Sequence, residues 1–83
     1  MGETEDVAVA ALDYLAEWFD EATVRCEVGE VGRHGVVTFV LRRGDRTAHV
    51  DVTHRAAAEA RYPGRLAGRV ARLADRELPP RAA

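Results

Sequence analysis

The spacing of hydrophobic residues changes from a helical period to a strand period partway along the chain, which limits the folds open to it. Between residues 5 and 21, apolar side chains recur at intervals of three and four, and this predicts an amphipathic helix. Thr4 is the predicted N-cap of that helix. From residue 23 to residue 28, apolar and polar residues alternate, which indicates a half-buried strand. A chain that begins in this way must pack a helix against a sheet.

Two further strands are predicted at residues 36–42 and 47–53. Between them lies the pair Gly44-Asp45, which is typical of a two-residue hairpin turn. This turn fixes the strand register and sets apolar residues opposite each other at three levels: Leu41 with Ala48, Phe39 with Val50, and Val37 with Val52. The apolar face of the predicted sheet carries Val24, Cys26, Val28, Val37, Phe39, Leu41, Ala48, Val50 and Val52.

The last third of the chain predicts a second helix that is interrupted. Thr53 can cap a helix that starts near residue 54. The run Tyr62-Pro63-Gly64 interrupts it, because proline disfavours helix at the preceding residue and Gly64 offers a left-handed stop. A further helical segment, from about residue 65 to residue 78, would bury four apolar residues: Leu66, Val70, Leu73 and Ala74. The segment ends at Pro79-Pro80, and residues 1–4 and 79–83 are expected to be frayed.

Together these elements predict an α+β fold. We expect one domain over residues 1–83, because 83 residues are too few for two. It would be a two-layer sandwich in the order helix, three-stranded antiparallel meander, then a helix broken or continuous at Pro63-Gly64, with the helices covering one sheet face. Double-stranded-RNA-binding domains share this element order. Their lysines at a helix start have no counterpart here, because the chain contains no lysine.

Missing residue types exclude whole classes of chemistry. The chain has no Lys, Ser, Asn, Gln or Ile, and all 12 basic residues are arginine. Without serine there is no Ser-His-Asp triad, and without lysine there is neither a Schiff base nor a P-loop. A GC-rich genome would account for this bias without any selection for guanidinium chemistry. Because the missing residue types exclude these catalytic groups, we expect a non-enzymatic protein with no cofactor.

The single cysteine, Cys26, bears on the compartment. It excludes an intrachain disulfide, and its predicted place on the core face favours a small buried hydrophobe over a reactive thiol. No apolar stretch is long enough to span a bilayer, and the acidic first residues are unlike a secretory signal. These features lead us to expect a cytoplasmic protein that does not bind membranes.

Charge is divided unevenly along the chain. Residues 1–41 hold nine acidic residues and two arginines, a formal charge of −7, whereas residues 42–83 hold ten arginines and five acidic residues, a formal charge of +5. Four of these arginines follow one helical face at intervals of four, three and four, and we call them the arginine stripe: Arg65, Arg69, Arg72 and Arg76.

The arginine stripe has several interpretations. It could be a solvated helix face, or it could pair with Asp13, Glu17 and Asp20 of the first helix. It could instead bind an acidic patch on a partner protein, or the phosphates of nucleic acid. Nucleic acid ranks last, because a pI of about 5.9 and an acidic first helix would repel phosphates.

The uncovered sheet face is the second candidate surface. Its residues include Arg25, Val36, Thr38, Val40, Arg42, His49 and Asp51. It could be an ordinary solvated face, or an interface with a partner or with a second copy. The outer strands would also leave unpaired edges. His49 and Asp51 share this face, but two ligands without a third make a weak metal signal, so no metal is expected.

Tyr14 and Trp18 lie at the margin of the first helix's apolar face, and a partly exposed Trp18 would indicate a contact surface. The sequence thus predicts a small interaction domain, an adaptor, inhibitor or regulatory subunit, whose partner is another protein or a second copy. The alternative is a nucleic-acid-binding module that uses the arginine stripe.

Overall fold

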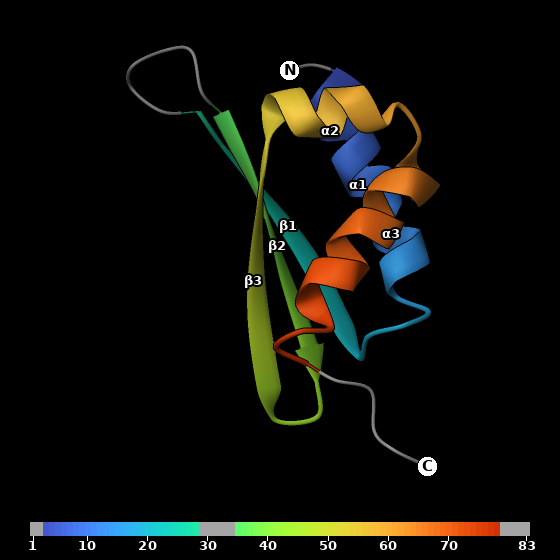
Figure 1. Ribbon diagram of the computed structural model, residues 1–83, viewed down its shortest axis with the longest axis vertical. Coiled ribbons are helices and arrows are strands. Elements are labelled where there is room, and N and C mark those ends of the chain that lie inside the picture. Colours follow the sequence, from blue (N-terminus) through green and yellow to red (C-terminus); the bar gives the residue numbers. More distant parts are fainter. Residues whose placement is uncertain (1–2, 29–34, 79–83) are drawn as a thin grey trace.

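The computed structural model describes the backbone of residues 3–28 and 35–78, and the side chains of residues 5–26 and 35–78. It confirms the α+β prediction, with a helix, three antiparallel strands and two further helices (Figure 1). The elements are α1 (Glu3–Leu15), β1 (Glu21–Val28), β2 (Gly35–Arg43), β3 (Arg46–Thr53), α2 (His54–Ala60) and α3 (Pro63–Ala74). All three helices lie on the same side of the sheet (Figure 1).

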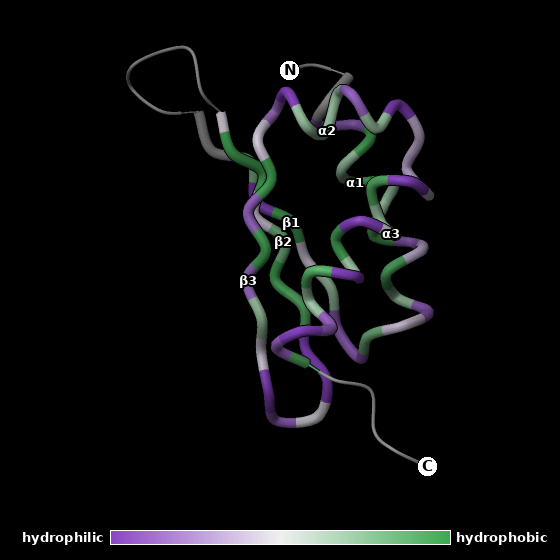
Figure 2. The backbone as a smooth tube through the Cα atoms, viewed as in Figure 1, coloured by the Kyte–Doolittle hydropathy of each residue, from purple (hydrophilic) through white to green (hydrophobic). Residues whose placement is uncertain are grey.

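The sheet is an antiparallel meander in the order β1-β2-β3. The three predicted cross-strand pairs are confirmed, because the two-residue turn at Gly44 leaves Arg43 opposite Arg46 and fixes every pair behind it. Gly44 has a φ of 68°, a conformation that glycine adopts without the steric cost of a Cβ. Hydrophobic and hydrophilic residues alternate along β3, as a sheet with one covered face requires (Figure 2).

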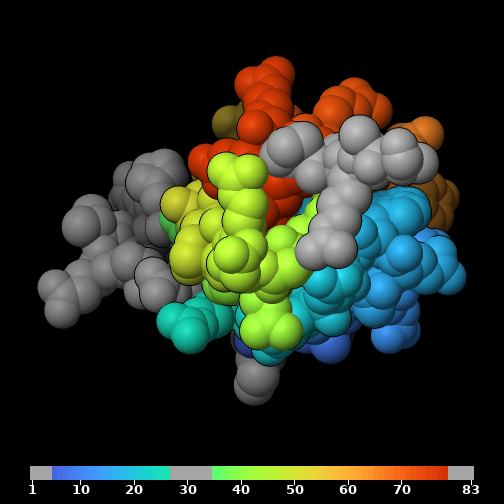
Figure 3. All heavy atoms as spheres, turned by 90° about the horizontal axis from the view of Figure 1, so that it is seen from below, coloured from blue at the N-terminus to red at the C-terminus, as the bar shows by residue number. Residues whose placement is uncertain are grey.

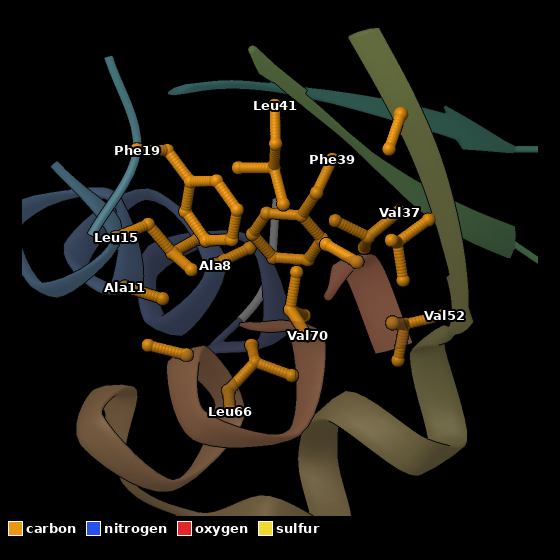
Figure 4. Packing of buried hydrophobic residues seen from close by; sticks show 14 of the residues in the cluster. Ala8, Ala11, Leu15, Phe19, Val37, Phe39, Leu41, Val52, Leu66 and Val70 are labelled. Carbon is orange, nitrogen blue, oxygen red and sulfur yellow. The ribbon is translucent and has the colours of Figure 1, made fainter. Parts of the chain in front are cut away.

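One hydrophobic core lies between the sheet and the helices (Figure 4). Phe39 of the central strand is fully buried, among side chains from α1, α3 and the neighbouring strands. Each element contributes the residues that its period sets inward: Ala8, Ala11 and Leu15 from α1, Val37, Phe39 and Leu41 from β2, Ala48, Val50 and Val52 from β3, and Leu66, Ala67, Val70 and Ala74 from α3. On the outer strand β1, Val24 and Cys26 are half-buried, and the side chain of Val28 lies outside the described residues.

The first helix differs from its prediction at both ends. It begins at Glu3, inside the segment expected to be frayed, so Thr4 lies within the helix and is not its N-cap. It ends at Leu15, six residues before the predicted end at residue 21. The amides of Glu17 and Trp18 bond three residues back instead of four, and the amide of Asp20 bonds the carbonyl of Arg42. This hydrogen bond joins the chain to β2 one residue before β1 begins.

The break between α2 and α3 is confirmed, but its left-handed residue is Arg61 and not Gly64. Arg61 has φ 65° and ψ −35°, and the Tyr62 amide donates to the Ala60 carbonyl at 2.7 Å across it. This is the rarer, strained kind of γ-turn. Gly64 instead lies in the first turn of α3, whose first residue is Pro63.

The buried face of α3 also differs by one residue. Leu66, Val70 and Ala74 are buried as predicted, but Leu73 is 40% exposed and Ala67 is buried instead. The α3 helix packs mainly against α1. The buried face of α3 therefore includes Ala67, and Leu73 lies outside it, beside the arginine stripe. The helix itself ends at Ala74, and a turn continues to Leu78.

Candidate binding surfaces

The arginine stripe lies on the outer face of α3 and on the turn that follows it. The inner face of the helix is held in the core, so the opposite face is turned to solvent, and all four arginines are exposed. None of them has a carboxylate oxygen within 4.0 Å among the described residues. The ion pairs considered with Asp13, Glu17 and Asp20 are therefore not formed, although α1 and α3 lie side by side (Figure 1). The Asp20 carboxylate accepts a hydrogen bond from the Gly44 amide at 2.6 Å instead.

A groove of about 640 Å³ runs between the end of α1 and α3, and we call it the α1–α3 groove. It is lined by Glu17, Trp18, Arg43, Gly68, Ala71, Arg72 and Asp75. The groove exists because α3 presents small residues to α1: a Cβ added at Gly68 would meet no atom within 4 Å. It opens next to Arg72, so it is continuous with the arginine stripe. Figure 3 views the molecule from the end where the hairpin, the end of α1 and the end of α3 meet.

Two aromatic side chains border this region, one from α1 and one from the turn that follows it. Trp18 is 45% exposed and forms part of the groove wall, and Tyr14 is similarly exposed, with its ring over Gly64 of α3. The sequence pattern indicated that both lie at the margin of the apolar face. The groove itself could not be foreseen, because it depends on which side of α3 meets α1.

Arg43 fixes the floor of the groove. Its guanidinium donates to the carbonyl of Trp18 at 3.0 Å, to the Asp75 carboxylate at 3.1 Å and to the carbonyl of Leu78. Its Cζ also lies 4.4 Å from the centre of the Phe19 ring. The sequence predicts only that Arg43 lies between the two strands, beside the hairpin turn. The signal for its role was the alternation of β2, because Arg43 follows Leu41 on the core-facing side.

The sheet face opposite the helices is uncovered. We call it the open face, and its described residues are Glu21, Thr23, Arg25, Val36, Thr38, Val40, Arg42, Thr47, His49, Asp51 and Thr53. On the central strand Val36, Thr38 and Val40 are half-buried by their neighbours, whereas the other residues are exposed. Two polar contacts cross this face: the Thr38 hydroxyl donates to Asp51 at 2.8 Å, and Arg42 lies 3.6 Å from Glu21. The structure therefore brings all seven predicted face residues together.

The described histidine, cysteine and acidic residues form no cluster of three that could hold a metal. His49 and Asp51 share the open face, but the carboxylate of Asp51 is bonded to Thr38. The ring of His54 packs on Gly35, where a Cβ would approach it to 2.6 Å. Burial, with the nearby carboxylate of Glu5 adding to it, raises the pKa of the Cys26 thiol, which favours the neutral thiol over the thiolate.

The chain was compared with family models, with curated proteins and with solved structures, and no match was found. Over the residues that the structure describes, no helix has the length and apolar character needed to cross a membrane.

Proposed function

We propose that the chain is a non-enzymatic protein-interaction domain that binds an acidic segment of a partner protein on its helical side. The observation that carries this proposal is the state of the arginine stripe. Its four arginine side chains are exposed, and none has a carboxylate partner among the described residues. One of them, Arg72, lines a groove that is walled by the half-exposed Trp18.

Composition and shape together favour a protein partner. Tryptophan, tyrosine and arginine are the residues that most often dominate the energy of protein interfaces. Guanidinium groups bind carboxylates through bidentate hydrogen bonds. Arginines spaced along a helix therefore suit a segment that carries several Asp or Glu residues. The α1–α3 groove could accept one apolar side chain of that segment against Trp18, above the small residues Gly68 and Ala71.

A peptide array tests this proposal. Random twelve-residue peptides of graded acidic content are probed with the wild-type chain, and we expect bound peptides to be enriched in Asp and Glu with one large apolar residue. Arg69→Glu with Arg72→Glu should abolish the acidic preference. Arg46→Glu with Arg55→Glu makes the same change of charge on exposed residues away from the stripe, and it should leave binding unchanged.

A third variant separates the groove from the stripe. Gly68→Leu fills open space in the groove, so it should remove the preference for an apolar residue and keep the preference for acidic ones. Binding without acidic enrichment, or equal loss in the stripe variant and its control, would contradict the proposal.

Nucleic acid is a second candidate, because the stripe arginines, which have no carboxylate partner among the described residues, are also available to phosphates. If it binds there, the logarithm of affinity falls with the logarithm of salt concentration by roughly 0.7–0.9 for each phosphate neutralised. Filter binding of duplex and single-stranded RNA at two salt concentrations measures this slope. Binding that is lost in the stripe variant alone would favour nucleic acid, and no binding at low salt would exclude it.

A further inference from the structure

We propose that the open face is a self-complementary interface on which a second copy of the chain docks. Two sheets would pack face to face about a two-fold axis that runs parallel to β2. This inference rests on the sheet side of the molecule, so it is independent of the function proposed for the helical side. What carries it is the arrangement of charge across the three strands.

The strand register divides the open face into rows of three residues. Arg25 of β1 pairs with Thr38 of β2, and Thr38 pairs with Asp51 of β3. One row therefore has a cation at one edge, a hydroxyl in the centre and an anion at the other edge. Arg25 has no carboxylate within 4.0 Å among the described residues, so its charge is available to a partner.

A two-fold axis along β2 exchanges the two edges of the sheet. The β1 strand of one copy then faces the β3 strand of the other at the same level, which brings Arg25 opposite Asp51 twice in each dimer. Facing sheets lie about 10 Å apart, a separation that an arginine and an aspartate reaching toward each other can bridge. An axis across the strands would instead set Arg25 against Arg25, and like charges in contact oppose association.

The centre of the face suits close contact between copies. Val40 and Thr38 would each meet their own counterpart on the axis, with no charge between them. Arg42 would also meet its counterpart, but each Arg42 lies 3.6 Å from Glu21 of its own chain, so that end of the interface carries balanced charge. The natural twist of about 30° between packed sheets moves these ends apart.

The size of the face predicts a weak dimer. Strands of eight residues are about 26 Å long and three strands are about 14 Å wide, which gives a footprint of roughly 370 Å². Stable interfaces bury about 800 Å² on each partner. We therefore expect rapid exchange and a dissociation constant in the micromolar range or above. The test must reach millimolar concentrations of the chain.

Charge reversal with mixing tests the proposed axis directly. Arg25→Glu and Asp51→Arg each convert both ion pairs of the dimer into like-charge pairs, and each variant alone should dimerise at least about tenfold more weakly. In an equimolar mixture, the new carboxylate of one variant faces the new guanidinium of the other. The unchanged Asp51 and Arg25 also face each other, so the dimer should return. Arg69→Glu and Asp13→Arg are the matched controls, because they make the same charge changes on the helical side.

Sedimentation equilibrium measures the dimer, and thermal melts check that each variant is folded. Amide chemical shifts of the wild type, measured as the chain is diluted, give a second readout that needs no variant. The shifts of residues 25, 40 and 51 should change with concentration, and those of α3 should stay constant. A wild-type monomer up to about 1 mM, variants that dimerise like the wild type, or a mixture that stays monomeric would overturn the proposal. None of these results bears on the peptide array, so the two proposals fail separately.

Discussion

At the scale of single residues, Arg43 joins parts of the molecule that are far apart in the sequence. Its side chain bonds the turn after α1 through Trp18 and the turn after α3 through Asp75 and Leu78. The neighbouring Arg42 points to the open face and makes one exposed ion pair. Two adjacent arginines on opposite faces of one strand therefore have different structural roles.

Replacing each of them by alanine should show this difference. Arg43→Ala removes the hydrogen bonds to Trp18, Asp75 and Leu78 and a cation–π contact, so we expect it to lower the free energy of unfolding by about 1–3 kcal/mol. Arg43→Lys should recover little, because a single ammonium cannot reach all three acceptors. Arg42→Ala should cost less than about 0.5 kcal/mol. Urea denaturation measures all three, and equal effects of the two alanine variants would contradict this role.

Cys26 gives a prediction about pH. Its pKa is raised above the ordinary value of 9.0 by burial, so the folded chain holds the thiol form more strongly than the unfolded chain does. The stabilisation from Cys26 is therefore complete below pH 9.0 and is lost as the pH rises through the folded pKa. Stability should fall more between about pH 8 and 11 in the wild type than in Cys26→Ala. Iodoacetamide should react with the folded chain more slowly than with free cysteine, and equal rates would be inconsistent with this account.

At the scale of elements, the γ-turn between α2 and α3 holds a strained residue. Arg61 has a φ of 65°, which costs a residue with a Cβ of the order of 1–2 kcal/mol relative to glycine. Arg61→Gly should relieve that strain and raise the free energy of unfolding by about 0.5–1 kcal/mol. Arg65→Gly, in the first turns of the regular helix α3, should lower it by a similar amount. Thermal melts of both variants measure the effect, and destabilisation by Arg61→Gly would rule out the strain.

The elements that the sequence predicted well are those controlled by nearby residues. The Gly44-Asp45 turn determined the β2–β3 register, and Thr53 caps α2 by accepting the Ala56 amide at 3.0 Å. The predictions that were wrong concern features that depend on contacts between residues far apart in the sequence. The α1 helix ends early because the chain joins β2 through Asp20, and Leu73 is exposed because α3 packs on α1. The α1–α3 groove and the contacts of Arg43 depend on the same packing, so no local pattern could reveal them.

At the scale of the whole molecule, one core serves both layers, and Phe39 lies at its centre (Figure 4). Phe39→Ala should cost about 3–5 kcal/mol, because it leaves a cavity that the sheet and the helices cannot both close. A chain of 83 residues has a total stability of only about 4–12 kcal/mol, so this one substitution should remove a quarter or more of it and lower the midpoint of thermal unfolding.

The same argument predicts a single transition. Because α1, α3 and the sheet all pack on Phe39, they should unfold together in the wild type and in Phe39→Leu, which keeps most of the volume. Far-ultraviolet circular dichroism follows the secondary structure, and the fluorescence of Trp18 follows the junction of α1 with α3. Coincident curves are expected at every temperature, with the midpoint of Phe39→Leu between those of the wild type and Phe39→Ala. If the Trp18 signal changed well before the dichroism, the helical layer would have a stability of its own and the shared core would not control folding.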